Sequence, residues 1–155
     1  MAYDIALGIL PHRTLESVGA TGPSTSFFDA TGMTAEALTA AQVGPHVVLA
    51  DPMFGETAKV VAGDAQLFLV ILGGTADQYV IQAIGPQERL RVQLAGELIE
   101  DTGAPLEAEA ALTEDDDAED GHIAVIERLA GASFAEIQNA EFLAIDQSTA
   151  LSPSR

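Results

Sequence analysis

The chain has 155 residues, no cysteine and a formal net charge of −18. This length accommodates one domain with its own core, and a hydrophobic content of 48% is that of a globular protein rather than a disordered acidic tail. The lack of cysteine excludes disulfides, thiolate catalysis and cysteine-ligated zinc or iron–sulfur centres, and the acidity disfavours nucleic acid and anionic lipid as partners.

The negative charge lies mainly in the later part of the chain. Up to Leu94 there are nine acidic and four basic residues, and after it there are fifteen and two. The densest run contains six carboxylates, namely Glu114, Asp115, Asp116, Asp117, Glu119 and Asp120. Because such a surface attracts basic protein surfaces, we interpret this run as the partner-binding face.

The sequence suggests a cytoplasmic protein that does not bind membranes. The first residues lack the basic stretch of a signal peptide, and Pro11 interrupts the apolar segment that begins there. The longest apolar run, Leu67–Leu72, is far shorter than the roughly 20 residues that cross a bilayer.

The first part of the chain predicts short alternating elements. Pro11 and the Asp51-Pro52 pair should end two apolar strands, and Thr34 should cap a helix in which Glu36 complements the dipole. The expected elements, in order, are a strand over 3–10, a helical turn between Thr14 and Gly19, a loop over 22–26, a helix over about 35–42 and a strand over 46–50.

The middle of the chain predicts an antiparallel β-meander. Three strands, over 66–72, 79–84 and 89–94, are separated by turns at Gly73-Gly74 and Gly85-Pro86, and residues 97–100 follow as a fourth. The segment 89–94 alternates charged or polar with apolar residues. The alternation predicts that Arg89 and Arg91 face solvent while Leu90 and Val92 are buried.

The last part predicts mainly helices. A helical stub over 106–112 precedes an amphipathic helix from about Ala118 or Gly121 to Leu129, Ser133 can cap a further short helix, and Phe142–Ile145 is a last strand. The fold class is therefore α+β, an antiparallel β-meander sheet with helices packed on one face. We expect a single domain over 1–147, a flexible tail over 148–155, and one core cluster of Ile71, Val80, Leu90, Val92, Ile123, Ile126 and Leu129.

The stretch Glu-Asp-Thr-Gly-Ala-Pro-Leu at residues 100–106 stands between the end of the meander and a helix. It resembles a pattern found in small, acidic, uncharacterised α+β proteins of actinobacteria. The resemblance covers about Leu67–Leu129. It implies an antiparallel sheet with helices on one side, and it brings no catalytic residues.

The clearest chemical candidate is a calcium loop that starts at Asp116. Counted from there, the fifth residue is Asp120, the sixth is Gly121, the eighth is Ile123 and the twelfth is Glu127, as helix–loop–helix calcium sites require. The third is Ala118, which has no ligand oxygen. Two interpretations follow: an acidic flank before a helix that binds calcium weakly, or a metal site formed by Asp116, Asp120 and Glu127.

No catalytic constellation is visible. His12, His46 and His122 lie far apart in three different predicted elements, and Gly73-Gly74-Thr75 lacks the lysine of a phosphate-binding loop. The phenylalanines at 27, 28 and 54 are interpreted mainly as core residues, with a contact surface as the alternative. Beyond weak calcium, no cofactor is predicted.

Three classes of function follow from the sequence. The leading one is a non-enzymatic protein-binding module with an acidic C-terminal face, such as an inhibitor or immunity-type protein for a basic partner. The second is a small enzyme whose site forms only in three dimensions, which an exposed cleft holding His46 or His122 beside a carboxylate would favour. The third is a divalent-cation binder through residues 116–127.

Overall fold

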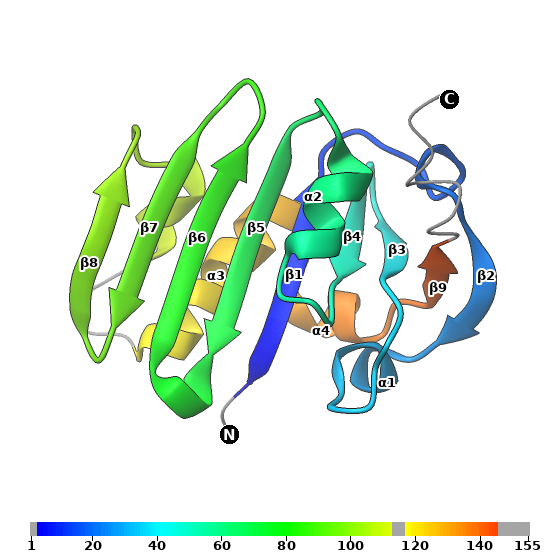
Figure 1. Cartoon of the computed structure of the whole chain (residues 1–155), viewed down its shortest axis with the longest axis horizontal. Coiled ribbons are helices and arrows are strands. Elements are labelled where there is room, and N and C mark those ends of the chain that lie inside the picture. The colour runs from blue at the N-terminus through cyan, green and yellow to red at the C-terminus, as the bar shows by residue number, and fades with distance from the viewer. Residues whose placement is uncertain (1–2, 113–116, 146–155) are drawn as a thin grey trace.

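The computed structural model describes residues 3–112 and 117–145 and contains one nine-stranded sheet (Figure 1). The strands are β1 (Asp4–Leu10), β2 (Ala20–Thr25), β3 (Thr39–Val43), β4 (His46–Ala50), β5 (Leu67–Gly73), β6 (Gln78–Ile84), β7 (Arg89–Leu94), β8 (Glu97–Thr102) and β9 (Phe142–Ile145). Their order in the sheet is β2-β9-β3-β4-β1-β5-β6-β7-β8, and every neighbouring pair is antiparallel.

Four α-helices and three 3₁₀ turns connect the strands of the described chain. They are α1 (Phe27–Thr31), α2 (Glu56–Ala62), α3 (Ala118–Ala130) and α4 (Phe134–Gln138), with η1 (Glu16–Val18), η2 (Gly74–Ala76) and η3 (Glu107–Ala111). The α+β class and the meander β5-β6-β7-β8 are confirmed. Among these described helices, none is long and apolar enough to cross a membrane.

The helices cover both faces of the sheet. Residues of α1, α3 and α4 form the larger core cluster with one face, and Ala58 of α2 belongs to the smaller cluster on the other. Figure 1 shows α2 in front of the sheet and α3 behind it. Because α2 lies over β5, β1 and β4 only, the face of β6-β7-β8 on its side has no helical cover.

The predicted orientation of β7 is wrong. Arg89 is only 4% exposed, and it points to the face that carries α3 and η3, whereas Leu90 and Val92 are half-buried on the opposite face. The strand alternates as predicted, but its charged side faces the helices. Two carboxylates make this arrangement favourable because they neutralise the buried arginine.

The predicted core cluster is therefore partly wrong. Ile126 is fully buried in the larger cluster, with Ile123 and Leu129 packed beside it. On β5 and β6, the buried residues of this cluster occupy the positions that alternate with the predicted ones: Val70, Leu72, Tyr79, Ile81 and Ala83. Ile71, Val80, Leu90 and Val92 belong to the other face, because a shift of one position in a strand reverses the side to which a side chain points.

Two local predictions in the first part are also wrong. The segment expected as a loop contains β2, an edge strand in which Pro23 is tolerated. The helix expected over about 35–42 is replaced by β3, which pairs with both β4 and β9. In both cases tertiary pairing overrides the local signals. The predicted tail over 148–155 lies outside the described residues.

Candidate functional site

The predicted acidic face is only partly described. Glu114, Asp115 and Asp116 lie outside the described residues, whereas Asp117 and Asp120 are exposed at the start of α3. Glu119 is 8% exposed, and its Oε2 accepts a hydrogen bond of 2.8 Å from the backbone N–H of Tyr3. This corrects the prediction for Glu119, because its carboxylate anchors the start of the chain and is not available to a partner.

The calcium loop is not formed in the described part of residues 116–127. Residues 118–127 belong to α3, so Asp120 and Glu127 stand two helical turns apart, roughly 10 Å along the axis. Glu127 Oε2 accepts a hydrogen bond of 2.7 Å from the N–H of Phe134, at the start of α4. Among the described residues, no three His, Asp or Glu side chains are arranged to hold a metal ion.

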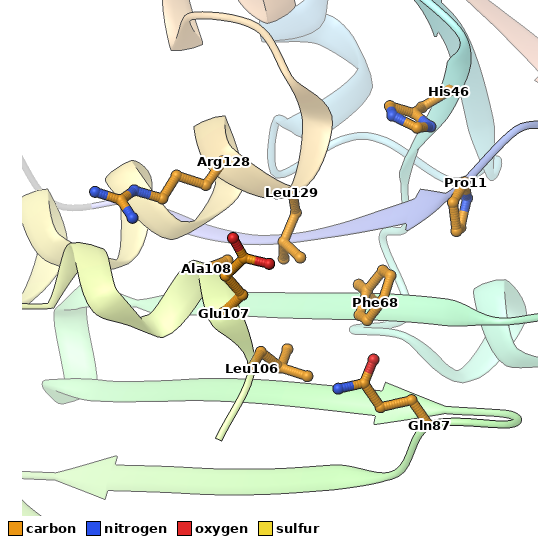
Figure 2. Close-up of a pocket in the computed structure, with 9 residues that line it drawn as sticks. All are labelled: Pro11, His46, Phe68, Gln87, Leu106, Glu107, Ala108, Arg128 and Leu129. Atoms are coloured by element: carbon orange, nitrogen blue, oxygen red, sulfur yellow. The ribbon is translucent and has the colours of Figure 1, made fainter. Parts of the chain in front are cut away.

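A pocket with a volume of about 600 Å³ lies where β1, β4 and β5 meet η3 and α3. We call it the large pocket. Figure 2 shows its apolar lining, with Phe68, Leu106 and Leu129 around one space. Four polar side chains also belong to the lining, and they are His46, Gln87, Glu107 and Arg128. The volume lies within the range of small-molecule sites.

His46 and Glu107 both line this pocket. A histidine beside a carboxylate in a cleft would favour the enzyme hypothesis. In Figure 2 the two side chains come from different walls, and none of the hydrogen bonds in the described chain joins them. His46 Nδ1 instead accepts a hydrogen bond of 3.1 Å from the N–H of His12. Burial and the neighbouring His12 lower the pKa of His46, which favours its neutral form. An acid–base pair is not assembled.

A buried ionic network lies behind β7, and sequence reasoning missed it. Arg89 donates from Nε and Nη2 to the two oxygens of Glu109, each at 2.8 Å, and it also pairs with Asp101. Glu109 Oε2 further accepts from the N–H of Leu106 at 2.7 Å. Burial opposes the charge of Glu109, but the bonds from Arg89 and Leu106 outweigh it and lower the pKa of Glu109. The Arg89–Glu109 pair is structural because both side chains are covered, whereas Asp101 reaches Arg89 from an exposed position.

His122 is also buried and lies close to this network. Its ring stacks on Tyr79 at 4.9 Å, and its Nδ1 is 2.7 Å from the carbonyl oxygen of Ala118. Its Nε2 is buried with no hydrogen-bond partner within the described chain. Burial lowers the pKa of His122, so the neutral ring is the form that the fold accepts.

A second feature is an exposed apolar patch at the other end of β1 and β4. We use this name for four exposed side chains on two segments: Phe28 and Met33, in and after α1, and Met53 and Phe54, in the loop after β4. Their exposed fractions run from 49% for Phe54 to full exposure for Met33. Met33 and Phe54 line a common pocket of about 330 Å³, together with Ala30, Thr31, Pro52 and others. The charged residues of this lining, Asp4 and Asp51, are both acidic.

Asp51 holds the loop that presents the patch. Its Oδ1 accepts from the N–H of Met53 at 2.8 Å and from the hydroxyl of Thr57, and its Oδ2 accepts from the N–H of Ala58 at 2.8 Å. The loop places Phe54 at a φ of +52°, which is unfavourable for a side chain of this size. The strain and the exposure fall on the same residue, which suggests a function for it.

The tight turn into α2 completes this arrangement. Gly55 has a φ of +100°, and a Cβ at that position would lie 2.4 Å from Leu69. Only glycine therefore fits here. The interpretation of Phe28 and Phe54 mainly as core residues is wrong, because their side chains are 66% and 49% exposed, whereas Phe27 is buried as expected. Nothing local could have shown that Phe27 is buried and Phe28 exposed.

Comparisons of the chain with protein-family models, with curated proteins and with solved structures gave no match. The class of protein is thus defined by its own fold: the described residues form an α+β protein with a nine-stranded antiparallel sheet, the large pocket on the α3 side of the sheet, and the apolar patch near one end of β1 and β4.

Proposed function

We propose that this protein is a non-enzymatic protein-binding module whose partner brings an apolar anchor flanked by basic residues. The observation that carries the proposal is that Met33 and Phe54, from two separate segments, line one largely apolar pocket whose charged lining residues are acidic. Phe28 and Met53 are exposed on the same two segments. Single exposed apolar side chains are ordinary on protein surfaces, but a group of aromatic and methionine side chains is typical of interaction sites.

The chemistry of the patch favours an adaptable apolar contact. Methionine is flexible and polarisable, and methionine-rich surfaces accept varied partners. The pocket between Met33 and Phe54 can receive one anchoring side chain from the partner, which is how most binding energy is concentrated. Ser26 caps α1 by accepting from the N–H of Asp29 at 3.2 Å, and Asp51 fixes the neighbouring loop, so both halves of the patch are supported.

The acidic residues around the patch support the proposal that the partner is basic. Asp29, Glu36 and Glu56 are exposed on the same segments as the patch, and Lys59 is already paired with Glu56 at 3.7 Å. The net charge of −18 adds a long-range attraction for cationic proteins. Such attraction is screened over about 10 Å at 0.1 M salt, so binding should weaken as salt rises.

The acidic run remains part of the proposal as a second contact. Asp117 and Asp120 are exposed, and they extend the acidic surface without contributing apolar contact. An inhibitor or immunity-type role against a basic protein suits this combination of an apolar patch and a high negative charge.

Site-directed crosslinking tests the proposal. A photoreactive amino acid at position 33, which is fully exposed, should capture one defined partner in the source cell. Capture should be lost in the double variant Phe28→Ser/Phe54→Ser. It should persist in Leu98→Ser/Ile99→Ser, a matched control that changes two exposed apolar residues of β8.

Three outcomes would contradict the proposal. The first is equal loss of capture in both double variants, and the second is capture of an acidic partner whose binding does not respond to salt. The third is capture that survives the patch variant. The variant Asp115→Asn/Asp116→Asn/Asp117→Asn tests the second contact separately, and unchanged capture would remove the acidic run from the interface.

A further inference from the structure

The large pocket of Figure 2 is independent of the apolar patch. Its lining includes Pro11 and His46, at the end of β1 and the start of β4, whereas the patch pocket includes Asp4 and Asp51, at the opposite ends of the same strands. Between Ala6, which lines the patch pocket, and Pro11, which lines the large pocket, lie the four residues Leu7–Leu10 of β1, a separation of roughly 17 Å. A ligand in the large pocket therefore does not compete with a partner on the patch.

The base of the pocket is apolar and firmly held. Leu106 and Ala108 are buried, and Phe68 and Leu129 pack partly against the larger core cluster. Leu106 donates its N–H to Glu109, which is fixed in turn by Arg89, so this wall of the pocket is tied to β7. An apolar ligand body would replace water on this base at a gain of roughly 25 cal/mol per Å².

Two polar groups with oxygen acceptors accompany this base. In Figure 2 the amide oxygen of Gln87 is directed toward Phe68 and its amide nitrogen toward Leu106, and the carboxylate of Glu107 is on the side of Leu129. The backbone of Gln87 is fixed by Gln66, which accepts from its N–H at 2.8 Å and donates to its carbonyl oxygen at 3.0 Å. No lysine, arginine or histidine nitrogen of the described chain lies within 4.0 Å of Glu107.

Arg128, the arginine of the lining, forms no ion pair with Glu107 among the described residues. Arg128 contributes its aliphatic stem, and its guanidinium is turned away from Phe68 and Gln87 (Figure 2). Burial lowers the pKa of His46, which disfavours a second cation in the lining. The space therefore combines an unpaired carboxylate, an amide oxygen and the aromatic ring of Phe68, and all three attract a cation.

We propose that this pocket binds an organic ammonium group carried on an apolar body, with Glu107 pairing the ammonium and Phe68, Leu106 and Leu129 holding the body. The ligand is either a free amine or the lysine side chain of a protein, since both present the same chemistry. The negative field of the chain raises the local concentration of either one.

Calorimetry with three small probes of similar shape tests the charge preference. The probes are 2-phenylethylamine, 2-phenylethanol and 3-phenylpropanoate, which are cationic, neutral and anionic at pH 7. We expect binding of the amine and at least about tenfold weaker binding of the other two, a difference of roughly 1.4 kcal/mol. No binding of the amine at millimolar concentration, or equal binding of the alcohol, would overturn the proposal. Preference for the carboxylate would do so as well and would assign the pocket to Arg128.

Two variants locate the site. Glu107→Gln should weaken amine binding about tenfold, whereas Glu100→Gln, which removes an exposed carboxylate of β8 outside the pocket, should leave it unchanged. Unfolding curves identical to the parent's verify that both variants fold. Amine binding that is unchanged in Glu107→Gln, or equally weakened in both variants, contradicts the assignment.

Two further binding measurements distinguish a free amine from a protein lysine as the ligand, and the large pocket from the apolar patch as the site. If the pocket takes a lysine side chain of a protein, lysine with both backbone termini blocked should bind more tightly than its side-chain-acetylated form. If the pocket takes a free amine instead, 2-phenylethylamine should bind and the blocked lysine should not. Amine binding should be unchanged in Phe28→Ser/Phe54→Ser. Loss of binding there would show that the two sites are not independent.

Discussion

The guanidinium of Arg89 and the carboxylate of Glu109 face each other with two hydrogen bonds of 2.8 Å, although the residues are twenty positions apart. This pair connects β7 to η3. Leu106 caps η3, and Glu107 and Ala108 precede Glu109 within it, so the pair also positions one wall of the large pocket.

Removal of the carboxylate should strongly destabilise the fold. Glu109→Ala leaves the buried Arg89 with only Asp101 as a charged partner, and a broken buried pair typically costs about 3–5 kcal/mol. Urea denaturation measures the change. Glu107→Ala, in the same turn but exposed, is the matched control and should change the free energy of unfolding by less than about 0.5 kcal/mol. Equal effects in both would show that the pair is not a stabilising contact.

The packing of α3 on the sheet predicts a second large loss. Ile126 is fully buried between α3 and the sheet, so Ile126→Ala should cost about 2–5 kcal/mol. Ile99→Ala, at an exposed position of β8, should cost little. Chemical denaturation of both variants tests this. A loss below about 0.5 kcal/mol for Ile126→Ala would mean that α3 is peripheral to the core.

The buried His122 predicts a loss of stability in mild acid. Burial holds the pKa of His122 below its unfolded value of 6.5, so the unfolded chain binds a proton that the folded chain does not. The destabilisation is absent above about pH 7.5, begins near the unfolded pKa and grows as the pH falls toward the folded pKa. The lowered pKa of His46 acts in the same direction.

Denaturation at pH 7.5, 6.5 and 5.5 measures this effect. The variant His122→Phe keeps an aromatic ring beside Tyr79 and removes the titrating group, so its stability should fall less over the same range. The lowered pKa of Glu109 acts only in stronger acid, because its stabilisation is lost as the pH falls below the unfolded value of 4.5. A parallel fall in the parent and the variant would exclude His122 as the cause.

Calcium should bind weakly to this chain. Residues 118–127 are helical, and Glu127 is engaged with the N–H of Phe134, so the ligands of a loop site do not converge. Calorimetric titration at physiological salt should therefore detect no tight site. Tight binding that is lost in Glu127→Gln would establish the cation site that the sequence pattern suggested.

Phe54 should contribute to binding rather than to stability. Phe54→Gly relieves a positive φ that costs about 1–2 kcal/mol, while glycine gives back roughly 0.5–1 kcal/mol through the freedom of the unfolded chain. The free energy of unfolding should stay within about 1 kcal/mol of the parent, whereas partner capture at position 33 should fall. A loss of more than about 2 kcal/mol would show that the ring has a structural role.

The sequence alone determined the secondary structure where local signals are dense. The meander from β5 to β8, the helix α3 ending at Gly131 and the short helix capped by Ser133 follow from hydrophobic periodicity, turn residues and caps, and these act over a few positions. The α+β class followed from the same signals. The net charge and its distribution were also available from the sequence.

Tertiary structure decided which way the elements face and which side chains meet. Arg89 was predicted to face solvent, and it is buried because Glu109 and Asp101, distant in sequence, neutralise it. Part of the 22–26 segment became a strand because β9, from the far end of the chain, offers a pairing partner. Part of the 35–42 segment became β3, which pairs along its length with β4, the next strand of the chain, and over two residues with β9. The pocket around Phe68 and Glu107 and the patch around Phe54 likewise join residues from separate segments. Periodicity fixes the alternation of a strand, but only the contacts between distant segments fix which of its two faces is buried.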